Sequence, residues 1–179
     1  MQGNTARPTI VKSRIRRRIS KALTVFITLT ITPAIGFANS ALEHARDLME
    51  TDQYTAALEA LSPLARSGNA DAEELIGVLY AMGLGVEQDY QRAFEWYLRA
   101  SLKGHPGAQS GIGWYYEVGL GMPAPDLVRA YMWYALSAIG GDPDAAISQE
   151  EVIKKMTAEE IEKAHILVHD YRSWMYPFR

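Results

Sequence analysis

Cysteine is absent from this sequence of 179 residues. Its absence excludes disulfide frameworks, thiolate metal sites, cysteine nucleophiles and a lipid anchor attached to cysteine. The rest of the composition shows no strong bias, since 48% of the residues are hydrophobic and 22% are charged. These proportions are those of globular proteins, so the composition also excludes a chain that is disordered throughout, a collagen-like chain and a polytopic membrane protein.

Acidic residues are absent from the first 38 positions, which contain only basic charges. The chain as a whole has 18 basic and 21 acidic residues, so positions 39–179 carry a net charge of −10. Such a charge asymmetry usually marks a segment with a separate purpose. The seven basic residues of this segment are Arg7, Lys12, Arg14, Arg16, Arg17, Arg18 and Lys21.

The N-terminal segment has the order of a secretory signal peptide. A basic stretch is followed by an uncharged, mostly apolar one over residues 22–38, and Gly36 and Ala38 supply the small side chains of a cleavage site. We expect removal of residues 1–38 and a mature protein in the periplasm or outside the cell, with Pro33 keeping the chain before the cleavage site extended. A retained membrane anchor is less favoured, because the apolar stretch is short and rich in threonine. A twin-arginine signal is less favoured because polar residues follow the arginines, and a basic arm for nucleic acid because the mature chain is acidic.

An internal repeat governs the rest of the chain. The pattern that begins at Ala72 returns 36 residues later at Ala108, and its second half returns after 37 residues. A degenerate earlier copy carries Asp52, Ala57, Leu61, Leu64 and Gly68. The repeated positions are Ala72, Ile76, Gly77, Tyr80, Gly83, Gly85, Asp89, Ala93, Trp96, Tyr97, Ala100 and Gly104 in one copy, and Ala108, Ile112, Gly113, Tyr116, Gly119, Gly121, Asp126, Ala130, Trp133, Tyr134, Ser137 and Gly141 in the next.

The repeated residues predict two helices in each copy. Apolar residues at three- and four-residue spacing give each helix one buried stripe. Gly83 and Gly119 stand where the first helix must end, and the aspartates Asp89 and Asp126 stand where the second must begin. A glycine inside a helix, as at Gly77, implies that a neighbouring backbone or ring occupies the space of the missing side chain. Pro63 is expected to kink or shorten the second helix of the earlier copy, and Gly104 and Gly141 to end the second helices.

These motifs closely resemble the Sel-1-like repeat, a relative of the tetratricopeptide repeat. The resemblance implies an all-α fold: a short α-solenoid of antiparallel helix pairs, wound as a right-handed superhelix. It divides the mature chain into a degenerate repeat over 39–70, two repeats over 71–105 and 106–142, and C-terminal helices over 143–179 that cap the solenoid. Thr157 and Glu160 have the capping-box order that starts the last helix.

The expected function is protein binding without catalysis. Trp114 occupies the position of Val78 in the preceding copy, which the repeat signature leaves variable, so we expect it to lie at the centre of a partner-binding face. The C-terminal aromatics are expected to fold back onto the last helix, or else to dock on a partner or a second copy. The predicted partner-binding residues are Trp114, Val78, Gln109, Glu117, Trp174 and Tyr176; Tyr115 is expected in the core.

No catalytic, cofactor or metal site is predicted. His165 and His169 lie on one helix face near Glu162, but the pattern of zinc proteases is absent, and the glycine pairs follow no strand. The resemblance implies a scaffold or adaptor, and the signal peptide places it in the cell envelope with no membrane span after processing. The net charge of −10 favours a basic protein or peptide as partner and disfavours nucleic acid. A hydrolase related to penicillin-binding or β-lactamase-like repeats and a homo-oligomeric assembly subunit remain the alternatives.

Overall fold

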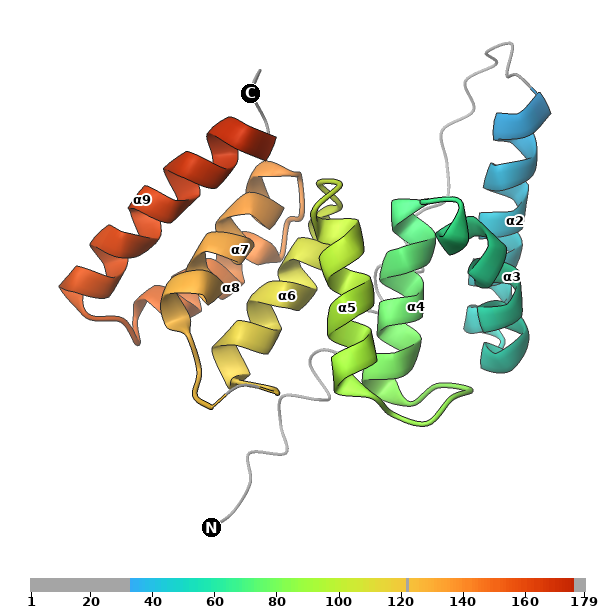
Figure 1. Ribbon diagram of the computed structural model, residues 1–179, viewed down its shortest axis with the longest axis horizontal. Coiled ribbons are helices and arrows are strands. Elements are labelled where there is room, and N and C mark those ends of the chain that lie inside the picture. The colour runs from blue at the N-terminus through green and yellow to red at the C-terminus, as the bar shows by residue number, and fades with distance from the viewer. Residues whose placement is uncertain (1–32, 122, 176–179) are drawn as a thin grey trace.

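The computed structural model describes residues 33–121 and 123–175, and every regular element within these ranges is an α-helix. Figure 1 shows the helices following one another as an elongated array, with α2 at one end and α9 at the other. The helices are α2 (Pro33–Glu50), α3 (Tyr54–Arg66), α4 (Ala70–Met82), α5 (Tyr90–Ser101), α6 (Pro106–Val118), α7 (Leu127–Ile139), α8 (Ala145–Ile153) and α9 (Ala158–Met175). This confirms the all-α repeat solenoid.

Successive helices pack as pairs, and the pairs stack through neighbouring helices. The closest associations are α2 with α3, α4 with α5 and α6 with α7, while α3–α4 and α5–α6 contacts join one pair to the next. The C-terminal end departs from this pattern, because α8 and α9 each pack mainly against α7 rather than against each other. The last helix therefore covers the end of the array from the side of α7.

The repeated polar residues cap the helices as the sequence predicts. The Asp89 carboxylate accepts the backbone N–H of Arg92 at 3.0 Å, and Asp126 accepts that of Arg129 at 2.9 Å. Gly83 and Gly119 end α4 and α6 in the left-handed conformation, with φ of 64° and 71°. Such caps satisfy backbone groups that a helix end leaves without partners.

Tyrosine rings occupy the space beside the glycines inside α4 and α6. A Cβ atom built on Gly77 would lie 3.0 Å from the ring of Tyr97, and one on Gly113 would lie 2.9 Å from the ring of Tyr134. A Cβ atom built on Gly111, in the next repeat, would lie 3.2 Å from the same Tyr97 ring. The expectation that a ring takes the vacant space is confirmed, and Tyr97 additionally joins two repeats.

Pro63 does not shorten its helix, and Pro33 does not keep the chain extended. Pro63 lies inside α3, which continues to Arg66 and has 13 residues, as α4, α6 and α7 do. Pro33 is the first residue of α2, a position where its missing N–H costs no helical hydrogen bond, and the helix runs through the expected cleavage site at Ala38. Residues 1–32, with the basic segment of the predicted signal, lie outside the described residues.

The C-terminal aromatics also differ from expectation, and so do the ends of two helices. Tyr171 and Trp174 belong to α9 itself, so this part of the tail does not fold back onto the helix. Tyr176 and Phe178 lie outside the described residues. The capping box is present, with Thr157 N–H donating to Glu160 and Glu160 N–H donating to Thr157 Oγ1. Helices α5 and α7 end at Ser101 and Ile139, before the predicted glycines Gly104 and Gly141, which follow with positive φ.

Candidate functional site

Two of the predicted binding residues lie in the core. Val78 is 2% exposed and Gln109 is fully buried. The Gln109 side-chain amide donates to the carbonyl of Ser101 at 3.3 Å and lies 3.5 Å from Met175 Sδ, at the far end of α9. The prediction that Val78 and Gln109 face a partner is wrong, because neighbouring helices cover this face of α4 and α6.

Glu117 is an internal clamp rather than a contact residue. Only 9% of its side chain is exposed, and its carboxylate accepts the hydroxyl of Tyr134 at 2.9 Å and the ammonium of Lys155 at 2.8 Å. These contacts tie α6 to α7 and to the segment that follows α8. The prediction that Glu117 binds a partner is therefore corrected: two intramolecular partners already hold its carboxylate.

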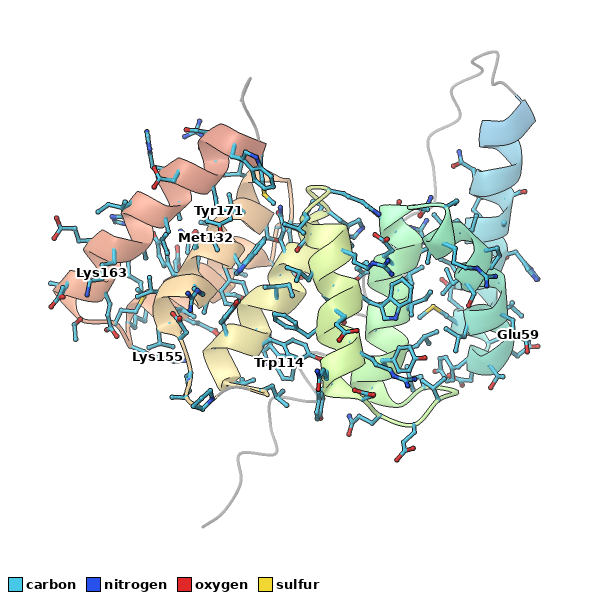
Figure 2. The ribbon with its side chains drawn as sticks, in the orientation of Figure 1. Glu59, Trp114, Met132, Lys155, Lys163 and Tyr171 are labelled. Carbon is cyan, nitrogen blue, oxygen red and sulfur yellow. The ribbon has the colours of Figure 1, made fainter. Side chains whose placement is uncertain are left out.

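Trp114, labelled in Figure 2, is half-buried at the meeting point of two hydrophobic clusters. The larger cluster extends over α2 to α7, and the smaller one gathers residues of α7, α8 and α9; Trp114 packs against both. The sequence interpretation that packing leaves this position unused is wrong. Its indole Nε1 is buried and has no hydrogen-bond partner among the described residues.

Aromatic rings surround the buried Tyr115, which is 1% exposed, as expected for a core residue. The centroid of its ring lies 5.4 Å from that of Trp114, 5.6 Å from Phe94, 6.1 Å from Tyr97 and 6.3 Å from Tyr90. Edge-on and tilted arrangements at these distances are the favourable ones for aromatic pairs. Four rings of this neighbourhood are exposed or half-buried, and we call them the aromatic surface: Tyr90, Phe94, Trp114 and Tyr116.

Arginines stack on the tyrosines of this region in the same way in both repeats. The Arg92 guanidinium lies 5.7 Å from the ring centroid of Tyr80, and Arg129 lies 5.7 Å from that of Tyr116. Each arginine also pairs with the aspartate that caps its helix, at 3.3 Å and 2.7 Å. These arginines were not among the predicted site residues, although Arg92 and Arg129 are 37 residues apart and so occupy equivalent repeat positions.

Three titratable or charged side chains meet at the start of α6. His105 Nδ1 accepts the backbone N–H of Ala108 at 3.1 Å, and its Nε2 lies 3.5 Å from the Asp71 carboxylate, which Arg46 also binds at 3.1 Å. The hydrogen bond from His105 lowers the pKa of Asp71. A carboxyl with a lowered pKa stabilises the fold while ionised, so this contribution is lost as the pH falls through that pKa.

Burial raises the pKa of the Tyr115 phenol, so its hydroxyl stays protonated to a higher pH than that of an ordinary tyrosine. That hydroxyl is buried and has no hydrogen-bond partner among the described residues. A buried polar group without a partner costs about 1–3 kcal/mol.

Tyr115→Phe is therefore expected to raise the free energy of unfolding, by about 1 kcal/mol, because it removes this hydroxyl and keeps the ring packing. Chemical denaturation of the two proteins measures the difference. Tyr134→Phe is the matched control, since its hydroxyl is bonded to Glu117 and its loss should destabilise. A Tyr115→Phe protein less stable than the parent would show that the hydroxyl has a partner, such as a bound water.

The described residues show no grouping of three or more metal-ligating side chains. In the predicted histidine pair, Nε2 of His165 lies 3.0 Å from the hydroxyl of Tyr131, so this imidazole is already engaged by α7. Over the same residues, no helix combines the length and the apolar character that crossing a membrane requires.

Comparison with known families identifies the repeat. The family model described as the Sel1 repeat matches residues 70–105 and 106–142, the two units that the glycine–tyrosine contacts and aspartate caps define. The chain contains two Sel1 repeats. The matched segments correspond to α4 with α5 and α6 with α7, so the remaining helices flank the Sel1 repeats on both sides.

Solved Sel1-type structures share the fold over most of this chain. A protective antigen present in uropathogenic Escherichia coli strains, with an SLR fold, is 25% identical; the match has a TM-score of 0.72 and covers 78% of this chain and 31% of that one. A Sel1 repeat protein from Oxalobacter formigenes is 27% identical, with a TM-score of 0.58, over 71% of this chain and 54% of that one.

A curated protein shares sequence over a shorter stretch. The ERAD-associated E3 ubiquitin-protein ligase component HRD3A of Arabidopsis thaliana is 40% identical over 58 residues, which are 32% of this chain and 9% of that protein. The chain thus spans only a part of each of these relatives. The two solved structures share the Sel1-type helical array with it.

Proposed function

We propose that this protein is a non-enzymatic scaffold that binds a protein or peptide partner through the aromatic surface. The observation that carries the proposal is the gathering of Tyr90, Phe94, Trp114 and Tyr116 between α5 and α6, with Arg129 stacked on Tyr116. Repeat solenoids bind through the positions that their stacking leaves accessible. Tryptophan, tyrosine and arginine are the residue types that contribute most to protein interfaces.

Tyr90 replaces Trp114 as the residue best placed to meet a partner. It is 37% exposed, while its ring packs edge-on against the buried Tyr115. An exposed ring that is already held by its neighbours loses little conformational entropy on binding. Trp114 supports the surface from behind, because its ring packs into both hydrophobic clusters.

The setting that we propose is outside the cytoplasm, in the cell envelope. The basic segment and the apolar stretch after it support export, and removal of residues 1–38 leaves a chain with a net charge of −10. An acidic protein of this kind favours basic partners and associates faster at low ionic strength. Mass spectrometry of the native protein tests the proposal: a mature N-terminus near Asn39 supports it, and an intact Met1-containing chain in the soluble cytosol contradicts it.

Two tyrosines of equal exposure allow a matched test of the surface. Tyr90 on α5 and Tyr171 on α9 are each 37% exposed, but only Tyr90 belongs to the aromatic surface. A photoreactive residue at position 90, introduced in the native cell, should capture the partner, which mass spectrometry then identifies. Tyr90→Ala is expected to weaken binding of that partner by about 2 kcal/mol, and Tyr171→Ala to leave it nearly unchanged.

Circular dichroism and thermal melting of both variants separate binding from folding. Equal loss of affinity in the two variants would place the binding site elsewhere. Loss of the helical signal in Tyr90→Ala would show that this ring is needed for folding, and a folded Tyr90→Ala protein with full affinity would contradict the proposed surface.

A further inference from the structure

Three turns of the same structure link one helix pair to the next helix along the array. Each contains a glycine with positive φ, at Gly68, Gly104 and Gly141, with angles of 89°, 81° and 103°. In each turn, the residue after the glycine donates its backbone N–H to the carbonyl five positions earlier. The residues around the three turns therefore occupy equivalent places, and their side chains can be compared.

A lysine side chain fills the space between the first two of these turns. Lys103, which directly precedes Gly104, extends back to the preceding turn, where its ammonium donates to the carbonyl of Gly68 at 2.9 Å. The same ammonium donates to the carboxylate of Glu73 at 2.6 Å, and Glu73 is buried. A lysine is thus part of the packing of the first Sel1 repeat.

In the second Sel1 repeat, a glycine stands at the position of this lysine. Gly140 precedes Gly141 as Lys103 precedes Gly104. A hollow of about 430 Å³ lies between Gly104 and Gly140, where a lysine at position 140 would extend. Figure 1 shows the C-terminal end of α9 on the same side of the array as the α5–α6 turn, and this end forms a wall of the hollow. The other lining residues include Leu102, Pro106, Trp174 and Met175.

The walls are suited to an alkyl chain that ends in a positive charge. Leu102 and Trp174 are 49% and 64% exposed, so their apolar surface is available to methylene groups. The face of a tryptophan ring also attracts an ammonium group. Such an interaction exists on α5, where the Arg99 guanidinium lies 5.0 Å from the ring centroid of Trp96.

The charges near the hollow also favour a cation. Lys103 borders the hollow, but the carboxylate of Glu73 already balances its charge. On the Pro106 side, the hydroxyl of Ser137 lies 2.7 Å from the Pro106 carbonyl oxygen and 3.0 Å from the carboxylate of Asp142, which is buried. A carboxylate that is little screened by water attracts a nearby cation more strongly than an exposed one does.

We propose that this hollow binds a lysine side chain of a partner protein, in the way that the first Sel1 repeat binds its own Lys103. The methylene groups lie against Leu102 and Trp174. The ammonium lies at the Trp174 ring and donates to the carbonyl of Gly104, as Lys103 donates to that of Gly68.

A single side chain in this hollow contributes weakly to the affinity. Gln109 stands where the first repeat has Glu73, and its amide nitrogen lies 3.5 Å from Met175 Sδ. Among the described residues, no carboxylate lines the hollow, so we expect a dissociation constant of about 1 mM or more for an isolated lysine side chain. The proposal rests on the proposed function only in its choice of a basic partner, because the hollow adjoins the end of α5 and Tyr90 begins that helix.

Two small probes test the hollow on the full-length protein at matched ionic strength. N-α-acetyl-lysine N-methylamide carries the ammonium, and the corresponding norleucine compound has the same carbon chain without it. In NMR titrations, the lysine probe should shift the amide signals of Gly104 and Gly140 and the indole signal of Trp174. It should bind about tenfold more tightly than the norleucine probe, because only the ammonium gains a charged hydrogen bond. Trp174→Leu should weaken binding of the lysine probe about threefold.

Gly140→Lys provides the lysine from within the chain. Gly140 has φ of −70° and ψ of −11°, which any residue adopts, so the new side chain adds no backbone strain. This variant should keep the helical circular dichroism of the parent and no longer bind the lysine probe. Ile147→Lys, which adds the same charge at an exposed position of α8, is the matched control and should bind the probe as the parent does. Tyr90→Ala should also leave probe binding unchanged, which separates this site from the aromatic surface.

Several results would overturn the proposal. Equal affinity for the two probes would make the hollow an apolar site, and equal loss of binding in Gly140→Lys and Ile147→Lys would reduce the effect to net charge. Undiminished binding by a folded Gly140→Lys protein, or no shift of the three signals, would exclude the hollow. Loss of probe binding in Tyr90→Ala would place the probe on the aromatic surface, and binding only after removal of residues 176–179 would assign the hollow to the chain itself.

Discussion

Gly85→Ala is expected to destabilise the protein by about 3 kcal/mol, whereas the equivalent change in the next repeat, Gly121→Ala, costs about 1 kcal/mol. Both glycines have a positive φ, 69° and 74°, which an alanine adopts only with strain. The difference lies in their surroundings. A Cβ on Gly85 would lie 2.6 Å from the backbone nitrogen of Thr55, while no described atom lies within 4 Å of a Cβ on Gly121.

The pair of variants isolates the contact between the α4–α5 loop and the start of α3. Backbone atoms cannot move aside as a flexible side chain can, so the clash at Gly85 must shift one repeat against the other. Chemical denaturation of the three proteins provides the measurement. Equal stability losses for Gly85→Ala and Gly121→Ala would mean that the loop does not approach α3 as closely as the structure describes.

Gly113→Leu is expected to cost about 3 kcal/mol as well, by overpacking rather than backbone strain. Its Cβ alone would lie 2.9 Å from the ring of Tyr134, and a leucine adds three further carbons. The ring has little freedom to yield, because Tyr134 is 3% exposed and its hydroxyl donates to Glu117. The gain in helix propensity over glycine, somewhat under 1 kcal/mol, offsets only part of this cost.

A double-mutant cycle identifies the cause of that loss. Tyr134→Ala makes room for the leucine, so the stability lost in Gly113→Leu/Tyr134→Ala should be smaller than the sum of the two single losses. Ala146→Leu, at an exposed position of α8, is the control and should change the stability by no more than about 0.5 kcal/mol. Strictly additive losses would show that leucine and the tyrosine ring do not compete for the same space.

The repeat architecture was predictable because its determinants are local and occur twice. Asp89 and Asp126 cap helices that begin at once after them, and Gly77 and Gly113 meet rings about 20 residues further along the same unit. A residue type that recurs at the same position of two repeats indicates a structural role, because chance seldom places it at the same position twice. The stacked arginine Arg92 could have been found in the same way, because Arg129 stands at the equivalent position of the next repeat.

The partner-binding residues were not predictable in the same way, because distant segments decide their burial. Gln109 is covered by Met175, 66 positions later, and Glu117 is bound by Lys155, 38 positions later. Both of these covering residues lie beyond the last repeat, where the sequence carries no signature. A variable position in the last repeat is therefore exposed only where the segments after that repeat do not cover it.

The ring of Tyr97, held between glycines of two successive repeats, has a consequence for how the array can change in length. One junction earlier, the positions equivalent to Tyr97 and Gly111 are held by Leu61 and Leu75, both buried in the same cluster. At the junction between the two Sel1 repeats, the large ring of Tyr97 lies against Gly111. At the junction before it, the two positions hold the medium-sized side chains of Leu61 and Leu75. Duplicating the unit 71–105 would bring Tyr97 to Leu75 and overfill the new junction, whereas duplicating the unit 106–142 would bring Tyr134 to Gly111, which is a tyrosine with a glycine once more.

At the next boundary along the chain, the positions equivalent to Tyr97 and Gly111 are Tyr134 and the small, buried Ser148. Side-chain volume at these positions therefore limits which unit can be copied. Recombination can lengthen this array by repeating the unit 106–142, whereas a repeated unit 71–105 would also need a smaller residue at position 75.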